Sequence, residues 1–416
     1  MGGVLEGVLK EVEAGREWCV NVLKDMVSIP TVNPPGEHYG EFADLASQIL
    51  RSIGMDVRVL EVPKDLVLKH YPECVEHPRY VVLGRAGRGG PVVQFNGHYD
   101  VVPPGGGWSR NPFSPTVSGG RLYGRGSVDM KGGIAASLLA VKSFLASINS
   151  FKGSVEVALV PDEEIGGRTG TGYLLNSGVS SPNYVVIGEP SGVNNIWIGH
   201  KGAVWAYVDI YGRQAHASTP WTGVNAFEYM VKIAGEFMKS YKPVVEGRRS
   251  SYKYSGGVGD RAVVTIGGDV RGGAKVNVVP GYYSFSIDRR VIPEEDVDSV
   301  EGELRDFINS LKGKFREVKV GLRVVNKFPP VVTSTNSGLV RVAAEAVRGI
   351  TNSTPELTVC VGGLDMWYYS VRGVEVVAYG PGPVSNAHIA DEFVSLKEVE
   401  EVAKVYATIL YKLLTS

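Results

Sequence analysis

The stretch PVVQFNGHYDVVPP at residues 91–104 places a histidine and an aspartate directly after an apolar run. The run is typical of a buried strand, and the two prolines that follow prevent its continuation. Residues i and i+2 of an extended segment share a face, so His98 and Asp100 are expected to point the same way. The aspartate could then accept a hydrogen bond from the imidazole and leave the other ring nitrogen free for a metal ion. Taken alone, however, such a pair is more often a surface turn.

Strand-like and helix-like segments alternate around this stretch. Residues 91–97, 153–160 and 182–189 are apolar runs typical of buried strands, and residues 132–147 between the first two have a helical pattern. Residues 4–27 also have apolar positions at helical spacing, and residues 41–62 predict a helix, a stop at Gly54 and a strand. This alternation predicts an α/β fold with a largely parallel sheet.

A different pattern begins near residue 200. The segments 202–212, 223–241, 261–270, 275–291, 294–312 and 317–325 predict the order β-α-β-β-α-β, which is that of a ferredoxin-like unit. A chain of 416 residues also exceeds one ordinary hydrophobic core. We therefore expect an α/β domain formed by residues 1–199 and 328–416, interrupted by a smaller α+β insert at 200–327.

The composition excludes several classes of partner. Lys and Arg number 43 and Asp and Glu 44, so nothing favours nucleic acid or an anionic membrane surface. The three cysteines are far apart, which fits a reducing compartment better than a disulfide framework. The acidic N-terminus does not resemble a signal peptide, and no apolar run approaches the length of a membrane span. These features predict a cytoplasmic protein without a membrane partner.

Polar side chains follow the strand-like segments in places where ligands gather in open α/β sheets. They come after three strands, in a glycine-rich turn at 124–133 and in a loop at 380–392: His98, Asp100, Asp129, Glu163, Glu164, Glu189 and His388. Carboxylates at one edge of a sheet would repel one another unless a cation lay among them. Carboxylate and imidazole together suit zinc or a similar divalent ion. Each motif alone is typical of a turn or a solvated acidic run, but their shared position and order favour a metal site.

The same motifs resemble the dinuclear zinc amidohydrolase family of acetylornithine deacetylase, succinyl-diaminopimelate desuccinylase, aminoacylase and glutamate carboxypeptidase. The resemblance covers most of the chain, in the family's order, through GHYDVVP, GRGSVDMKGG, PDEEIGG, IGEPSG, GRQAHASTPWTGVNA and SNAHIADEFV. It implies a zinc-peptidase-like catalytic domain interrupted by a ferredoxin-like domain that serves as lid and dimerisation module. This fold agrees with the layout predicted from the sequence pattern.

The resemblance also implies roles for individual residues. Asp129 would bridge two Zn²⁺ ions, for which Co²⁺ may substitute. His98 and Glu189 would hold one ion, and Glu164 and His388 the other. Glu163 would be the general base that takes a proton from a water between the ions. The peptide bond from Asp129 to Met130 would be cis, and Asp100 would orient His98 without touching metal.

Three residues of the insert match family positions that contact substrate. His216 would cross from a partner subunit to stabilise the oxyanion, which implies a homodimer formed through the lid. Asn277 and Arg290 would grip the substrate, Arg290 through a bidentate contact with its carboxylate. Arg289 is expected on the opposite face of its strand. The other histidines, at 38, 70, 77 and 200, carry no motif and are expected to be structural or on the surface.

Two segments depart from the family pattern or have no functional interpretation. Residues 362–369, GGLDMWYY, lack a threonine that many relatives have, and their aromatic residues could line a substrate pocket or pack in the core. Residues 64–80 have no assigned role.

The sequence therefore predicts a metal-dependent hydrolase that cleaves the amide bond of an N-acyl amino acid, of the deacetylase or desuccinylase type. The alternatives are a carboxypeptidase or dipeptidase of the same family, acting on short peptides. A third possibility is a catalytically silent relative that uses the fold for binding or assembly.

Overall fold

The computed structural model describes residues 2–257 and 259–415, which form two compact units. The first unit comprises Met1–Ile198, Thr333–Leu357 and Leu364–Ser416. The second comprises Gly199–Val332 and Thr358–Gly363. The predicted insert, 200–327, thus lies within the second unit, which also takes in residues 328–332 and 358–363.

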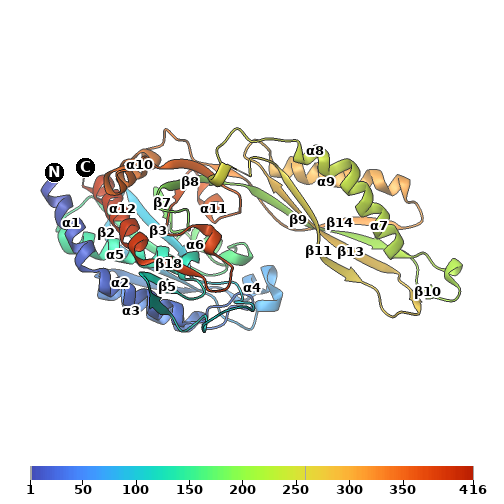
Figure 1. Ribbon diagram of the computed structural model, residues 1–416, viewed down its shortest axis with the longest axis horizontal. Helices are drawn as coiled ribbons and strands as arrows, with labels where there is room; N and C mark the ends of the chain where they lie inside the picture. Colours follow the sequence, from blue (N-terminus) through green and yellow to red (C-terminus); the bar gives the residue numbers. More distant parts are fainter. Residues whose placement is uncertain (1, 258, 416) are drawn as a thin grey trace. The chain divides into compact units, whose positions relative to one another are not determined.

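The first unit is built on a mixed sheet whose central strands are parallel (Figure 1). These strands are β6 (Gly153–Val160), β3 (Val92–His98), β7 (Tyr184–Ile187) and β17 (Glu375–Ala378). All residues of β3 and β6 are buried, as expected for strands covered on both faces. The predicted α/β fold with its parallel central sheet is confirmed.

Antiparallel strands extend this sheet at both edges. On one side β2 (Tyr80–Arg88) pairs with β6, and β1 (Asp56–Glu61) pairs with β2. On the other side β8 (Asn195–His200) pairs with β17. The strand β16 (Glu356–Cys360), whose residues are divided between the two units, pairs with β8. The first unit also has a small sheet formed by β18 (Phe393–Ser395), β5 (Arg121–Tyr123) and β4 (Thr116–Ser118).

Helix α5 (Gly132–Ser147) is apolar around most of its circumference because helices pack along it as well as the sheet. Its neighbours include α12 (Leu396–Leu414), α1 (Gly2–Ala14) and α2 (Arg16–Ser28). The helical pattern predicted over residues 4–27 is confirmed, but the chain forms two helices there because it turns at Gly15 between α1 and α2. A Cβ atom on Gly15 would lie 2.5 Å from Cδ1 of Leu139 on α5, so glycine allows this close approach without a shift of the leucine side chain.

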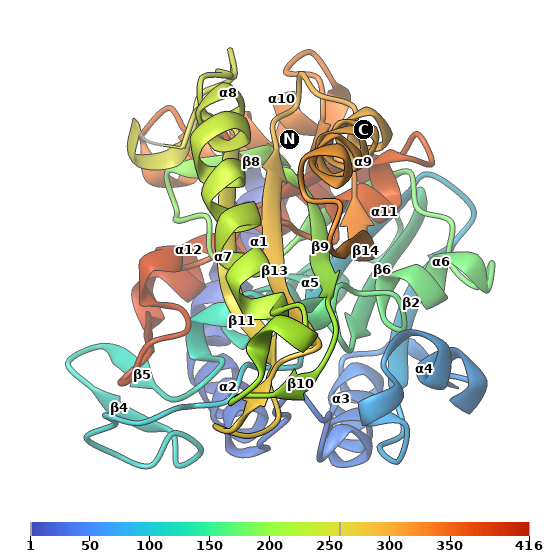
Figure 2. The same cartoon turned by 90° about the vertical axis from the view of Figure 1, so that its right-hand side faces the viewer.

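The second unit has the predicted ferredoxin-like order (Figure 2). Its antiparallel sheet has the strand order β11-β13-β9-β14, formed by Val263–Gly272, Tyr282–Val291, Gly202–Tyr211 and Lys319–Phe328. Helices α7 (Ala226–Glu236) and α9 (Val297–Lys314) contact this sheet and share one apolar core with it. The strand predicted over 275–291 is interrupted at Pro280, which has no N–H to donate, and its first part pairs elsewhere as β12 (Val278–Val279).

The remaining helices of the first unit are α3 (Tyr39–Ser52), α4 (Lys64–His70), α6 (Thr171–Asn176), α10 (Gly338–Thr351) and α11 (Met366–Ser370). Helix α8 (Lys242–Glu246) follows α7 in the second unit. Within residues 2–257 and 259–415, no helix combines the length and apolar character that crossing a membrane would require.

Candidate metal centre

Three neighbouring parallel strands end at the same edge of the sheet. His98, the last residue of β3, lies opposite Val160, the last residue of β6. On its other side, β3 pairs with β7 up to Asn96 and Ile187. The segments that follow β6 and β7 therefore leave the sheet beside His98 and carry Glu163, Glu164 and Glu189 with them. Strand register thus gathers side chains that are up to 91 positions apart in the sequence.

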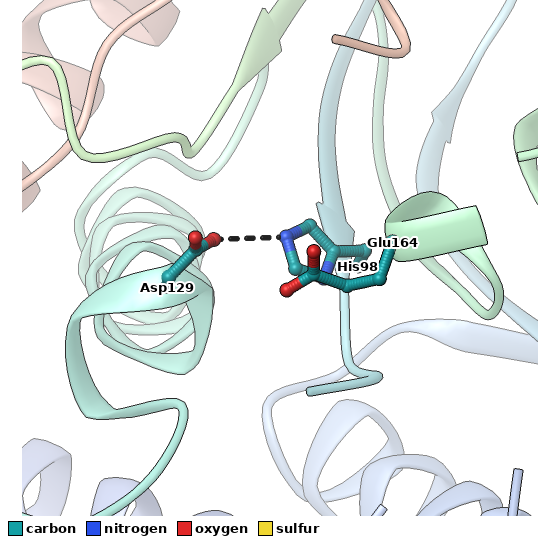
Figure 3. A group of neighbouring side chains, drawn as sticks. All are labelled: His98, Asp129 and Glu164. Carbon is teal, nitrogen blue, oxygen red and sulfur yellow. Dashed lines mark hydrogen bonds and ion pairs between the residues drawn. The ribbon is translucent and has the colours of Figure 1, made fainter. Parts of the chain in front are cut away.

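Asp129 lies between the two histidines that the sequence predicts as metal ligands. Figure 3 shows its contact with one of them, His98. It occupies the turn Ser127–Lys131 that opens α5, and its peptide bond to Met130 is cis, as predicted. Its Oδ1 is 3.1 Å from Nε2 of His98, and its Oδ2 is 3.3 Å from Nε2 of His388. Each carboxylate oxygen therefore faces a different imidazole, which is the arrangement a bridging ligand needs.

The other predicted ligands flank these histidines. Nε2 of His388 is 3.1 Å from Oε1 of Glu164, and Nε2 of His98 is 3.8 Å from Oε1 of Glu189. Ligand atoms of His98, Asp129 and Glu164 lie within 4.8 Å of one another, and so do those of His98, Glu163 and Glu189. Carboxylate oxygens and imidazole nitrogens in such groups fit zinc or cobalt.

Glu163 lies as close to this centre as the predicted ligands do. It shares a group with His98 and Glu189, so distance alone does not separate a base from a ligand at this position. The two glutamates differ in their neighbours. Glu164 contacts the imidazole of His388, whereas Glu163 lies near the carboxylate of Glu189, whose negative charge raises the Glu163 pKa.

The electrostatics favour bound cations. Burial, together with the charge of Asp129, raises the pKa of Glu189 to about 8. Burial also raises the pKa of Glu163 well above its usual value, and the charge of Glu189 adds to this shift. Hydrogen bonds to Asp129 and Glu164 raise the pKa of His388 to about 10. Without positive ions, the site thus retains protons that metal binding would displace.

Asp100 contacts more than the imidazole beside it. Nδ1 of His98 lies 3.0 Å from the backbone oxygen of Asp100 and 3.5 Å from its carboxylate. The backbone carbonyl of Asp100 is therefore a closer acceptor for the imidazole than the carboxylate. The carboxylate instead accepts the backbone N–H groups of Glu163 and Glu164, at 3.2 Å each. Asp100 thus holds the turn that carries both glutamates.

A buried polar network beneath this turn was not predicted from the sequence. The Asp162 carboxylate accepts hydrogen bonds from Tyr39 (3.1 Å), Arg79 (3.0 Å), Asn33 (3.1 Å) and Thr169. Asn33 also donates to Asp100 at 2.9 Å, so its amide links the two carboxylates. The residues of this network are distant from one another in the sequence and belong to no recognisable motif.

The network gives residues 64–80 a structural role. Arg79 belongs to this segment, and its guanidinium and the Asp162 carboxylate are fully buried. Val67, Tyr71 and Cys74 form a small apolar cluster, against which Ile165 packs directly after the two glutamates. The segment therefore contacts both residues that flank the Glu163–Glu164 pair, Asp162 through Arg79 and Ile165 through the apolar cluster.

The structure favours core packing for two of the aromatic residues in 362–369. Tyr369 is buried and its hydroxyl contacts Gln94 and Asn96 of β3. The Tyr368 hydroxyl donates to the backbone oxygen of Gly166 at 2.7 Å. Both side chains thus tie α11 to elements that carry the metal centre.

The predicted substrate contacts all lie in the second unit. His216 is exposed on β10 (Ala215–His216), where Nδ1 lies 2.7 Å from Oγ of Ser218. Pairing of β10 with β12 brings Asn277 close to it, since Ala217 donates to the Asn277 carbonyl at 3.0 Å. Arg290 is partly exposed beside Asp288, whereas Arg289 is buried, which confirms their opposite faces. The approach of these residues to the metal ligands remains a prediction.

The four histidines without a motif differ in their environments. His38 is exposed and lies 3.2 Å from Glu41, and His70 and His77 are partly buried in the segment that supports the glutamate turn. His200 is fully buried at the end of β8.

Carboxylates that are buried or partly buried, the buried His98 and the exposed His388 meet at the carboxyl edge of an α/β sheet. This combination is typical of a metal-dependent hydrolase centre. The family model for Peptidase family M20/M25/M40 matches residues 94–412, and the chain belongs to this family of metal-dependent amide hydrolases. Succinyl-diaminopimelate desuccinylase of Wolinella succinogenes is 31% identical over 323 residues, covering 74% of this chain and 81% of the relative. The desuccinylase of Nautilia profundicola is 29% identical over 331 residues, covering 77% and 84%.

Solved structures share the fold over nearly the whole chain. The dipeptidase Dug1p of Saccharomyces cerevisiae has a TM-score of 0.79 at 16% identity and covers 98% of both chains. Human carnosine dipeptidase 1 has a TM-score of 0.74 at 18% identity and covers 98% of this chain and 99% of its own. At these identities the likeness establishes the fold alone.

Proposed function

We propose that the protein is a dinuclear zinc hydrolase that cleaves the amide bond of an N-acyl amino acid, of the deacetylase or desuccinylase type. The observation that carries this proposal is the position of Asp129, whose two oxygens face two different histidines. His98 with Glu189, and His388 with Glu164, would complete two ligand groups around it. The mixed nitrogen and oxygen donors suit Zn²⁺, and Co²⁺ could replace it.

Bound cations would polarise the amide carbonyl and lower the pKa of a water molecule at the site. Glu163 would take the proton from the attacking water and deliver it to the leaving nitrogen. Asp100 supports this role by holding the Glu163 backbone through its N–H. His216 would donate to the oxyanion, and Asn277 and Arg290 would hold the substrate, Arg290 through a free carboxylate.

A dipeptidase or carboxypeptidase activity is the second candidate. Solved structures of two dipeptidases share the fold over 98% of this chain, so the fold is compatible with this substrate class as well.

A substrate panel separates these candidates. Enzyme reconstituted with zinc or cobalt is incubated with N-succinyl and N-acetyl amino acids, dipeptides, and matched substrates whose carboxylate is an amide. We expect hydrolysis of one class of substrate with a free carboxylate. The matched substrate whose carboxylate is an amide should react more weakly, because Arg290 would bind the carboxylate. Metal binding without hydrolysis of any substrate would favour the catalytically silent relative instead.

A further inference from the structure

The side chain of Glu392 is buried against the backbone of Asp129, and none of the roles proposed above involves it. Its Oε1 accepts the backbone N–H of Val128 at 3.0 Å and that of Asp129 at 3.3 Å. Its Oε2 lies 2.5 Å from Nη1 of Arg125. Both members of the Glu392–Arg125 pair are almost fully buried, at 0% and 2% exposure.

The fold brings this pair to Asp129 through the small sheet of the first unit. Strand β18 begins at Phe393 and pairs antiparallel with β5, with Phe393 opposite Tyr123. Glu392 precedes β18, and its backbone carbonyl accepts the N–H of Gly124. The chain before β18 therefore lies beside the glycine-rich turn 124–133, which carries Asp129. His388 is four residues earlier in the same segment. One loop therefore contacts Asp129 twice, at its side chain through His388 and at its backbone through Glu392.

Charge balance explains the presence of Arg125. Glu392 adds a negative charge close to the carboxylates of the metal centre, and an unpaired buried charge there would be costly. Arg125 neutralises it and is itself anchored by a hydrogen bond from Nη2 to the backbone oxygen of Pro104 at 3.2 Å. A buried ion pair of this kind contributes little net stability compared with apolar residues of the same volume. Its distinctive property is that it fixes where the Glu392 oxygens lie.

We propose that Glu392 is a positioning residue that sets the orientation of Asp129 for metal binding, with Arg125 as its counter-charge. The peptide N–H groups of Val128 and Asp129 are held by one carboxylate oxygen, so the Asp129 side chain keeps one oxygen toward each histidine. This inference rests on the proposed function, because it presupposes that Asp129 binds cations.

Two double variants test the proposal by separating the hydrogen-bond acceptor from the ion pair. Arg125→Met with Glu392→Gln removes both charges but keeps a carbonyl oxygen that can accept the two N–H groups. Arg125→Met with Glu392→Met has a similar shape and charge but no such acceptor. Zinc affinity is measured by competition with a chromophoric chelator, alongside thermal unfolding of the metal-free proteins.

We expect the Gln variant to bind zinc within about threefold of the wild type and the Met variant to bind roughly 10–100-fold more weakly, the usual effect of losing a partner of a metal ligand. Arg85→Met with Glu156→Met is the control, because this pair includes a buried glutamate of the same unit that contacts Gln94 and Ser180 instead. It should lower the melting temperature without changing zinc affinity.

Equal zinc affinities of the Gln and Met variants would overturn the proposal, since a purely structural ion pair would affect both alike. If the Met variant does not fold, Glu392→Asp provides the test, because it keeps the charge but withdraws the carboxylate by one methylene. Wild-type zinc affinity in that variant would also overturn the proposal. Failure of the wild type to bind zinc would contradict the proposed function, and this inference with it.

Discussion

Glu163 and Glu164 are adjacent in the sequence, but different chemical roles are proposed for them. Both follow β6, and both donate their backbone N–H group to the Asp100 carboxylate. Burial raises the pKa of each side chain. Glu164 faces His388 directly, at 3.1 Å, and this contact favours it as the ligand of the two. Glu163 would then remain available for proton transfer.

Glu163→Gln is therefore expected to lower turnover by about 10²–10⁴-fold, the usual contribution of a general base. The amide has the size of the carboxylate but cannot take the proton, so two metal ions per chain should remain bound. Steady-state rates and elemental analysis of the same preparation measure both effects. Glu164→Gln is the matched control, and it should lose metal. A Glu163→Gln protein that lost an ion would show that the two roles are assigned the wrong way round.

The ligands could be predicted from the sequence because each follows a strand-like run or opens a helix, which are positions that an open sheet brings together. The residues that hold the ligands could not. Asn33 contacts Asp100 and Asp162, which lie 67 and 129 positions away, and Glu392 contacts Asp129 across 263 positions. Such pairs depend on the tertiary packing of several elements, and no spacing in the chain indicates them.

At the scale of elements, the segment 64–80 supports the turn after β6 through the buried Arg79–Asp162 pair. Arg79→Met would leave the Asp162 carboxylate buried without its counter-charge. We expect a loss of about 3–5 kcal/mol in the free energy of unfolding, the usual cost of breaking a buried pair.

The pair between Lys64 and Glu76 in the same segment provides the control, because both side chains are exposed. Lys64→Met should change the free energy of unfolding by less than about 1 kcal/mol. Urea unfolding of both variants in the metal-free state measures the difference. A loss below about 1 kcal/mol for Arg79→Met would contradict the supporting role of the segment.

The end of β8 gives a prediction for the pH dependence of stability. Burial lowers the pKa of His200 to about 4, and the charge of Arg290 adds to this shift. An unfolded histidine titrates near pH 6.5, so the unfolded chain binds the proton more tightly. The stabilising contribution is complete above pH 6.5 and is lost as the pH falls toward 4.

The wild type should therefore lose about 2 kcal/mol more than His200→Gln between pH 7.5 and pH 5. Glutamine does not titrate, and the other ionisable groups are common to both proteins, so their effects cancel in the comparison. Chemical unfolding in the presence of a chelator measures the two stabilities. A parallel loss in the two proteins would show that His200 does not carry this dependence.

Element boundaries were harder to predict than element types. Apolar spacing continues across Gly15 because α1 and α2 both pack against α5, so the pattern does not mark the point at which the second helix begins. In the second unit, Pro280 divides a strand-like run between two sheets. The antiparallel edges of the main sheet were likewise not predicted, because strand direction depends on the connections and not on the composition of each strand.

At the scale of the whole molecule, the β-α-β-β-α-β order predicted a ferredoxin-like unit, and the second unit has one four-stranded antiparallel sheet in the order β11-β13-β9-β14. The assembly of the protein remains a prediction. His216 lies on a short exposed strand, and we expect it to reach the metal centre of a second copy in a homodimer.

Mixing chains tests this expectation. His216→Ala and Glu163→Gln proteins should each be inactive, but their mixed dimer has one site with an intact base and an intact donated histidine. Activity should therefore return after the chains are exchanged. The recovered site should be roughly 10²–10³-fold faster than a site without the oxyanion donor. Each protein refolded alone is the control. Confirmed mixed dimers without activity would show that His216 acts within its own chain or has no catalytic role.

The central claim, that Asp129 joins two metal ions in an amide hydrolase, is tested most directly by titrating the metal-free protein with zinc while hydrolysis of the best panel substrate is measured. The account predicts an inactive metal-free enzyme, saturation at two ions per chain, and activity that rises with occupancy. Asp129→Ala should lose both tight binding and activity. Hydrolysis that persists in the metal-free protein, or saturation at a single ion per chain with full activity, would contradict the account.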